Sequence, residues 1–153
     1  MRTAELDKNW IPPQNPPVKG GLVKVFVYGT LKSGYGNNRL LKTSTFLGEA
    51  VLPDHIAYYY GSIGSFPFVV KNKGTSVTGE VYEVDQETLQ SLDYLEGYRE
   101  HSKSNFYDRT MAIVDMQDGS KEQVFYYLGH KDWLANPIEV FNRGGVYSWN
   151  RSQ

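Results

Sequence analysis

The sequence has no cysteine among its 153 residues and almost no net charge. Without cysteine the chain can form no disulfide, no thiolate zinc site and no cysteine nucleophile. Its 16 Lys and Arg residues nearly balance its 17 Asp and Glu residues, which gives a formal net charge of −1. A positive field that would attract a polyanion is therefore missing, and we expect no nucleic acid partner.

Long apolar runs are missing as well. No stretch reaches the roughly 18 apolar residues that a membrane-spanning helix needs, and the N-terminal segment has no apolar region typical of export signals. We therefore expect neither a membrane span nor export, and we predict a cytoplasmic protein. At this length the chain can bury one sizeable core but has no room for a second full domain.

Two kinds of functional site also lack support. The three histidines, His55, His101 and His130, are scattered and have no carboxylates at ligand-like spacing. We therefore predict no metal site. The chain also lacks the Gly-x-Ser-x-Gly elbow of a serine hydrolase.

What the chain has in quantity is tyrosine and glycine. Twelve Tyr and 15 Gly, with an aromatic content of 14%, favour strands joined by tight turns over a helical bundle. We predict strands at 23–27, 45–52, 56–60, 68–71, 77–84, 107–116 and 122–128. The Asp-Gly step between the last two predicts a hairpin. We expect an α+β protein whose mostly antiparallel strands form a small closed barrel or a strongly curled sheet.

The two ends of the chain differ in composition from the middle. Residues 1–21 include four prolines within 11–17, which predicts an extended arm or linker. The single domain then covers 22–153, and its tail from about residue 130 is rich in turn residues. We expect one helical turn at 37–42 and a short helix near Ile138–Phe141.

The segment after the first predicted strand offers backbone groups rather than catalytic side chains. Tyr28, Gly29, Thr30 and Leu31 follow an alternating valine strand that has one predicted buried face. Amide groups of such a loop can converge on an anion or a carbonyl oxygen. Gly34 is not followed by Lys and Ser or Thr, so we do not predict a nucleotide phosphate loop. A plain strand-to-turn connection is the alternative interpretation.

One clear helix is predicted after Val84. Asp85 is suited to the N-cap position and Glu87 to the first turn, while Gly97 ends the helix at its C′ position. One face of the helix carries three leucines: Leu89, Leu92 and Leu95.

Glu96 occupies the last turn of this predicted helix, where the C-terminal carbonyl groups disfavour a carboxylate. Asp93 adds a negative charge on nearly the same face, and Tyr94, Leu95 and Tyr98 can supply desolvation. We expect these effects to raise the pKa of Glu96, which suits a general base. The alternative interpretation is an ordinary solvated helix end.

Tyr107 and Arg109 flank Asp108 at the start of a predicted strand, so their side chains should lie on one face. They can line the same cavity as Glu96, and a structural ion pair is the alternative. Tyr126 and Tyr127 end the next strand, where we expect one of them to point inward as part of the core.

Together these segments resemble the γ-glutamylcyclotransferase-like family, particularly its γ-glutamylamine cyclotransferase and AIG2-like branch. The resemblance covers about residues 23 to 128. It rests on the order and spacing of four motifs: Val25–Gly34, Gly79–Val84, Leu92–Tyr98 and Tyr107–Arg109. The joint occurrence of Tyr-Gly-Thr-Leu with Leu-Asp-x-x-Glu-Gly is specific, although each motif alone is weak.

The resemblance implies a small β-barrel with outer helices and one polar cavity. In that cavity the loop from Tyr28 to Leu31 binds the glutamyl group of a small γ-glutamyl substrate, and Glu96 acts as general acid/base. The α-amine attacks the γ-carbonyl of the same group, which gives 5-oxoproline and releases an amine. This chemistry needs no cofactor, and we expect a monomer or a weak homodimer.

Two other functions remain open from the sequence. The same barrel can serve as a non-enzymatic module that binds a small metabolite or a peptide, because a fold does not by itself carry an activity. It can also remove a γ-glutamyl group from a larger intermediate through a wider cavity mouth.

Overall fold

A computed structural model describes residues 21–29, 31–34, 36–59, 67–96, 98–99, 107–129, 138–139 and 142–148. The predicted proline-rich arm therefore lies outside the described residues, apart from Gly21. No helix in the described ranges is long and apolar enough to cross a membrane.

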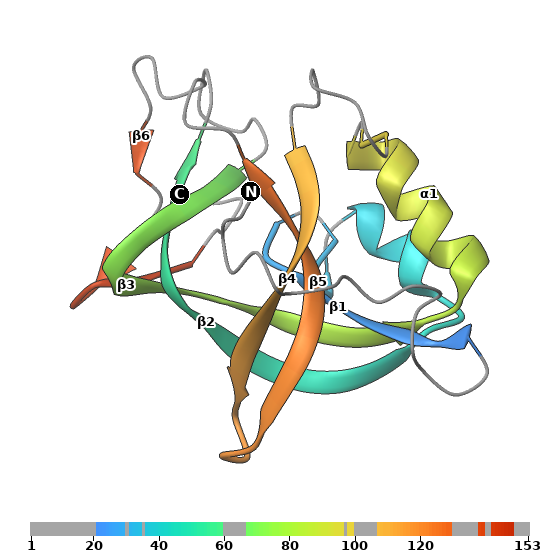
Figure 1. Cartoon of the computed structure of the whole chain (residues 1–153), viewed down its shortest axis with the longest axis horizontal. Helices are drawn as coiled ribbons and strands as arrows, with labels where there is room; N and C mark the ends of the chain where they lie inside the picture. The colour runs from blue at the N-terminus through green and yellow to red at the C-terminus, as the bar shows by residue number, and fades with distance from the viewer. Residues whose placement is uncertain are drawn as a thin grey trace, which may run out of the picture.

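The fold is a closed five-stranded mixed barrel with one α-helix outside it (Figure 1). Around the ring the strands are β1 (Val23–Val27), β3 (Pro67–Val84), β2 (Thr45–Tyr59), β4 (Tyr107–Met116) and β5 (Lys121–Gly129). Pairing of β2 with β3 closes the ring, so each of the five strands has a partner on both sides along part of its length. Only β1 and β5 pair in parallel within this ring; its other pairings are antiparallel. The predicted small, mostly antiparallel barrel is confirmed.

β2 and β3 form one long curved hairpin rather than the four short strands that we predicted (Figure 1). The pairing shifts at two places, between Phe46 and Gly48 and between Pro53 and His55. Asp54 has a φ of 62° at the second shift. Bulges of this kind bend a strand without ending it. Pro53 and Asp54, which are typical turn residues, therefore mark a bend within β2. We had predicted that a strand ends there.

β1 lies between β3 and β5 and is buried on more of its surface than predicted. Val25 and Val27 are buried as expected, but Phe26 is buried too, with 1% of its surface exposed. Its ring covers Gly79, where an added Cβ would lie 2.6 Å from the ring. The predicted single buried face was wrong because the strand is covered on both sides.

The predicted helix and hairpin are both confirmed. Helix α1 spans Gln86–Glu96, and the Asp85 carboxylate caps it by accepting a hydrogen bond of 2.7 Å from the Thr88 N–H. A 3-10 helix, η2 (Gly36–Leu41), takes the place of the predicted helical turn and lies beside α1. The hairpin pairs β4 with β5 in the register Asp115 to Lys121.

The described part of the tail adds short strands to the sheet. These are β6 (Ile138–Glu139), β7 (Asn142–Arg143) and β8 (Val146–Tyr147). β6 pairs with the end of β2, and β8 pairs with β3. The predicted helix near Ile138 is wrong at Ile138 and Glu139, because the exposed edge at the end of β2 binds this backbone as a strand.

Candidate active site

Glu96 lies at the last helical position of α1 and is partly buried. Burial, with a smaller contribution from the negative charge of Asp93, raises the pKa of Glu96 to about 7. The upward shift of the Glu96 pKa and the contribution of Asp93 to it are as the sequence predicts. Tyr94 and Leu95 do not supply the burial, since Tyr94 is 89% exposed and Leu95 40% exposed.

Three buried tyrosines of the barrel interact electrostatically with Glu96. Burial raises the pKa of Tyr28, Tyr107 and Tyr127, and in each case the charge of Glu96 contributes to the increase. Tyr28 follows β1, Tyr107 begins β4 and Tyr127 lies near the end of β5. The Glu96 carboxyl is therefore close enough to these phenol groups to interact with them electrostatically, and its low solvation favours its neutral form.

The end of α1 is closed by a hydrogen bond of 2.9 Å from the Tyr98 N–H to the Asp93 carbonyl oxygen. This six-to-one bond is the mark of a Schellman cap and makes Glu96 the C-cap residue. Gly97, the predicted C′ residue, lies outside the described residues. The local cap fixes the direction in which the chain leaves Glu96.

The first residues of the loop after β1 pack closely against the rest of the site. The Tyr28 hydroxyl donates a hydrogen bond of 2.7 Å to the Tyr127 carbonyl oxygen. Gly29 lies against Pro67, and an added Cβ would meet the proline ring at 2.9 Å. The Tyr107 hydroxyl donates a hydrogen bond of 2.6 Å to the Pro67 carbonyl oxygen. Tyr28, Gly29 and Tyr107 are thus brought together at this end of the barrel.

Side chains that we did not predict hold the rest of the loop. Leu31 is buried, and its carbonyl oxygen accepts a hydrogen bond of 2.8 Å from Asn38 Nδ2. The Ser33 N–H donates to Glu80 Oε1 at 2.8 Å, and the Tyr82 hydroxyl donates to the same oxygen at 3.0 Å. Thr30 lies outside the described residues. The loop is therefore fixed from η2 and from β3 as well as from its own turn.

Arg109 forms an ion pair with Asp93, with 2.5 Å between Nη1 and Oδ2. The Tyr127 hydroxyl donates a hydrogen bond of 2.7 Å to the other carboxylate oxygen of Asp93. Tyr107 and Arg109 lie on the same face of β4, as predicted, and Arg109 reaches the end of α1 through Asp93. Of the two interpretations of Arg109, the ion pair is the one that the structure contains.

Tyr127 is the site residue that the sequence reasoning missed. We expected one of Tyr126 and Tyr127 to serve as core, but both are buried and both make side-chain hydrogen bonds. The hairpin register could have identified Tyr127. Counting outward from the Asp-Gly turn places it opposite Arg109, a residue already assigned to the site.

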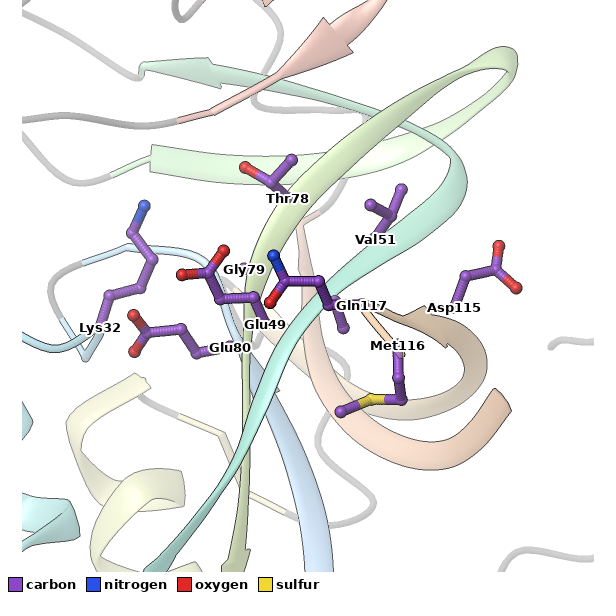
Figure 2. A pocket seen from close by; sticks show the side chains of 10 residues that line it. Lys32, Glu49, Val51, Thr78, Gly79, Glu80, Asp115, Met116 and Gln117 are labelled. Carbon is purple, nitrogen blue, oxygen red and sulfur yellow. The ribbon is translucent and has the colours of Figure 1, made fainter. Parts of the chain in front are cut away.

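A separate pocket of about 390 Å³ is lined mainly by residues of β2, β3 and the end of β4 (Figure 2). Its charged lining consists of Lys32, Glu49, Glu80 and Asp115, and Figure 2 shows the first three gathered on one side. Burial lowers the pKa of Lys32, and the charges of Glu80 and Glu49 oppose that effect. Glu96 does not line this pocket, so it is distinct from the site at the end of α1. In the described residues no group of three or more His, Asp or Glu side chains is arranged to bind a metal.

Comparison with known proteins identifies the family. The model of the family "Gamma-glutamyl cyclotransferase, AIG2-like" matches residues 25–147. A putative gamma-glutamylcyclotransferase of Methanocaldococcus jannaschii is 36% identical over 105 residues, which cover 67% of this chain and 81% of that protein. Gamma-glutamylaminecyclotransferase A of Danio rerio is 33% identical over 136 residues, which cover 80% of this chain and 81% of that protein.

A solved structure shows the same fold. The crystal structure of an AIG2-like protein from Mus musculus superposes with a TM-score of 0.63 at 26% identity, covering 86% of this chain and 98% of that one. The match to the family model takes in β1, the loop, α1 and the β4–β5 hairpin, which together form the site described above. The chain therefore belongs to the gamma-glutamyl cyclotransferase, AIG2-like family and is an enzyme of the cyclotransferase type.

Proposed function

We propose that this enzyme cyclises the γ-glutamyl group of a γ-glutamyl amine, with Glu96 as its general acid/base. The observation that carries the proposal is the Glu96 carboxyl at the end of α1, whose pKa is about 7 and whose charge acts on the buried Tyr28, Tyr107 and Tyr127. A carboxyl that titrates near neutrality can both accept and return a proton at physiological pH. The name of the Danio rerio relative supports an amine as the leaving group.

The reaction forms one C–N bond and breaks another. Glu96 removes a proton from the α-ammonium of the substrate, and the free amine attacks the γ-carbonyl carbon. This attack closes a five-membered ring. The bond from that carbon to the leaving nitrogen then breaks, which leaves 5-oxoproline. Two protons leave the α-nitrogen in total, and the leaving nitrogen gains two, so it departs as an ammonium. Glu96 carries protons between the two nitrogens and ends as it began.

The loop supplies the second part of the mechanism. In this proposal the backbone amides around Gly29, Thr30 and Leu31 bind the α-carboxylate of the substrate or the carbonyl oxygen that becomes negative. One such donor contributes roughly 3–4 kcal/mol to an oxyanion transition state. Because the nucleophile belongs to the substrate, no second reactant has to be brought in, and the enzyme lowers the barrier by holding the folded conformer in which the amine faces the γ-carbonyl. The route uses no cofactor.

Tyr107 and Arg109 have different parts in this proposal. Tyr107 is buried, and its hydroxyl is bonded to Pro67 beside Gly29, so its ring forms part of the wall against which the glutamyl group packs. Arg109 uses Nη1 for Asp93, so it acts on the site chiefly through that residue.

The test is to incubate the pure protein with a panel of γ-glutamyl amines and γ-glutamyl amino acids and to measure 5-oxoproline. We expect turnover of at least one γ-glutamyl amine and a loss of about a hundredfold or more in kcat for Glu96→Gln. Glu87→Gln is the matched control, since Glu87 is an exposed acid in the first turn of the same helix. No product from any compound, or equal rates for Glu96→Gln and wild type, would overturn the proposal. Saturable binding without turnover would favour a binding module.

A further inference from the structure

Asp93 ties the end of α1 to the barrel through its side chain and its backbone. One carboxylate oxygen accepts from Arg109 on β4 at 2.5 Å, and the other accepts from the Tyr127 hydroxyl on β5 at 2.7 Å. Its carbonyl oxygen accepts the Tyr98 N–H that closes the helix cap. Three bonds from three segments thus converge on one residue, one helical turn before Glu96.

We propose that Asp93 is a positioning residue that holds the Glu96 carboxyl in its place at the end of α1, and that Arg109 and Tyr127 hold Asp93 for this task. This inference rests on the proposed role of Glu96 as acid/base.

The donors are themselves rigid. Arg109 and Tyr127 are directly paired neighbours in the β4–β5 ladder, so the hairpin register alone brings both to the same carboxylate. The Arg109 guanidinium lies 5.2 Å from the centre of the Tyr98 ring and 4.9 Å from that of Phe125. Aromatic rings at these distances restrain and stabilise the guanidinium. Movement of the α1 end relative to the barrel would break several of these contacts together.

The degree of burial favours a positioning role over a purely stabilising one. The side chains of Asp93 and Arg109 are each only 18% exposed. A salt bridge withdrawn from water contributes little net stability, because desolvation of its charges offsets most of their attraction. Its geometry is nevertheless well defined, since both oxygens of Asp93 have a fixed donor.

The charges around Glu96 give each substitution a distinct direction. Within the described ranges, the groups that act on its charge are the neutral phenols of Tyr28, Tyr107 and Tyr127, the anion of Asp93 and, bound to that anion, the cation of Arg109. Loss of the Asp93 charge should lower the pKa of Glu96, since this charge now raises it. Loss of the Arg109 charge should raise it, because Asp93 would then act without its counter-ion.

The experiment is to titrate the Glu96 side-chain carboxyl by carbon NMR in the substrate-free protein, and to measure kcat against pH with the substrate that wild type turns over. For Asp93→Asn we expect the titration midpoint and the acid limb of kcat to move down by about half a pH unit or more. For Arg109→Gln we expect the titration midpoint and the acid limb of kcat to move to higher pH. Arg109→Lys keeps the charge, so it should restore the midpoint but not the full kcat, because Lys lacks the planar fork.

Tyr127→Phe tests positioning with the least disturbance, since it removes one hydroxyl and keeps the ring. We expect kcat to fall about tenfold or more while KM changes little, because a displaced catalytic group slows the reaction step. Tyr127→Phe also tests the inference if the Asp93→Asn protein does not fold. An unchanged midpoint in Arg109→Gln together with an unchanged kcat in Tyr127→Phe would overturn the inference. Failure of the proposed function is a separate outcome, shown by a wild type that makes no 5-oxoproline, and the NMR titration needs no substrate.

Discussion

The Tyr28 hydroxyl donates a hydrogen bond of 2.7 Å to the carbonyl oxygen of Tyr127, the same residue whose hydroxyl holds Asp93. The backbone of Tyr127 thus holds the first residue of the loop, and its side chain holds the end of α1. Both halves of the candidate site are tied to one position on β5. The distance between the loop and Glu96 is therefore set by β5, which is one of the five strands of the closed barrel.

Tyr28→Phe should weaken this connection. The substitution removes the buried donor to the Tyr127 carbonyl oxygen, and we expect the free energy of unfolding to fall by about 1–2 kcal/mol. Urea denaturation measures this change. Tyr94→Phe is the control, because Tyr94 is 89% exposed and its hydroxyl should contribute less than about 0.5 kcal/mol. Equal stabilities for the two variants would contradict the connection.

Glu96→Gln should make the protein more stable above pH 7. The pKa of Glu96 is about 7 in the folded protein against an ordinary value of 4.5, so between these values the folded state binds more protons than the unfolded state. Wild type therefore loses stability as the pH rises from 4.5 to 7, by up to about 3 kcal/mol from this group. Glutamine has no charge to desolvate.

Urea denaturation of wild type and Glu96→Gln between pH 5 and pH 8.5 measures this effect. The stability difference between the two proteins should grow with pH and level off above pH 7. Glu87→Gln should show no such growth, because its carboxyl is exposed. A constant difference at every pH would mean that Glu96 is solvated in solution.

Gly29→Ala should reduce activity by displacing the loop. An added Cβ would lie 2.9 Å from the Pro67 Cγ and 3.1 Å from its Cδ, and the proline ring has little freedom to move. We expect kcat/KM to fall about tenfold or more, since an error of about 1 Å in a binding group is costly. Gly34→Ala is the comparison within the same loop.

Gly34 has a φ of 91° and nothing within 4 Å of an added Cβ. Alanine there should cost about 1–2 kcal/mol of stability through backbone strain without pushing against a neighbour. We therefore expect Gly34→Ala to keep most of its activity at temperatures where it is folded. If both variants lose activity equally, contact with Pro67 is not the feature that places the loop.

The sequence predicts those parts of the fold that depend on local signals. The Asp85 cap, the buried Leu89 and Leu92, and the Asp-Gly turn each act within a few residues, and the helix and hairpin that they predict are present. Leu95 departs from the predicted face and is 40% exposed. The long β2–β3 pair could not be predicted in the same way, because residues that start turns in isolation become bulges when a partner strand continues past them.

In the candidate site, too, the local effects could be predicted from the sequence and the tertiary contacts could not. Asp93 and Glu96 share a helix, so the effect of one on the other could be predicted from their spacing. The burial of Glu96 could not, since it depends on the contacts of the end of α1 with β4 and β5, which form only when the barrel closes. Asn38 and Glu80, which hold the loop, likewise lie far from each other in the sequence and act through tertiary hydrogen bonds.

A buried histidine within the barrel gives a last prediction, independent of the site. His55 is 5% exposed, and its Nε2 lies 2.6 Å from the Tyr126 hydroxyl, while Nδ1 lies 2.9 Å from the Pro53 carbonyl oxygen. The Pro53 oxygen can only accept, so these partners fit a neutral ring with its proton on Nδ1 and the Tyr126 hydroxyl donating to Nε2. Burial, with a smaller contribution from the charge of Lys71, lowers the pKa of His55 to about 4 against the opposing effect of the bond to Pro53.

This pKa predicts acid destabilisation over a defined range. Between pH 6.5 and pH 4 the unfolded chain carries a proton on His55 that the folded protein excludes, so stability is fully present above 6.5 and falls as the pH drops, by up to about 3 kcal/mol. His55→Gln cannot take up this proton. It should be less stable than wild type at pH 7 but should converge with it toward pH 4, as measured by urea denaturation. The comparison isolates His55 because the other titrating groups are common to both proteins. Parallel curves for wild type and His55→Gln would show that the ring is hydrated in solution, whereas convergence means that the barrel interior excludes the charge.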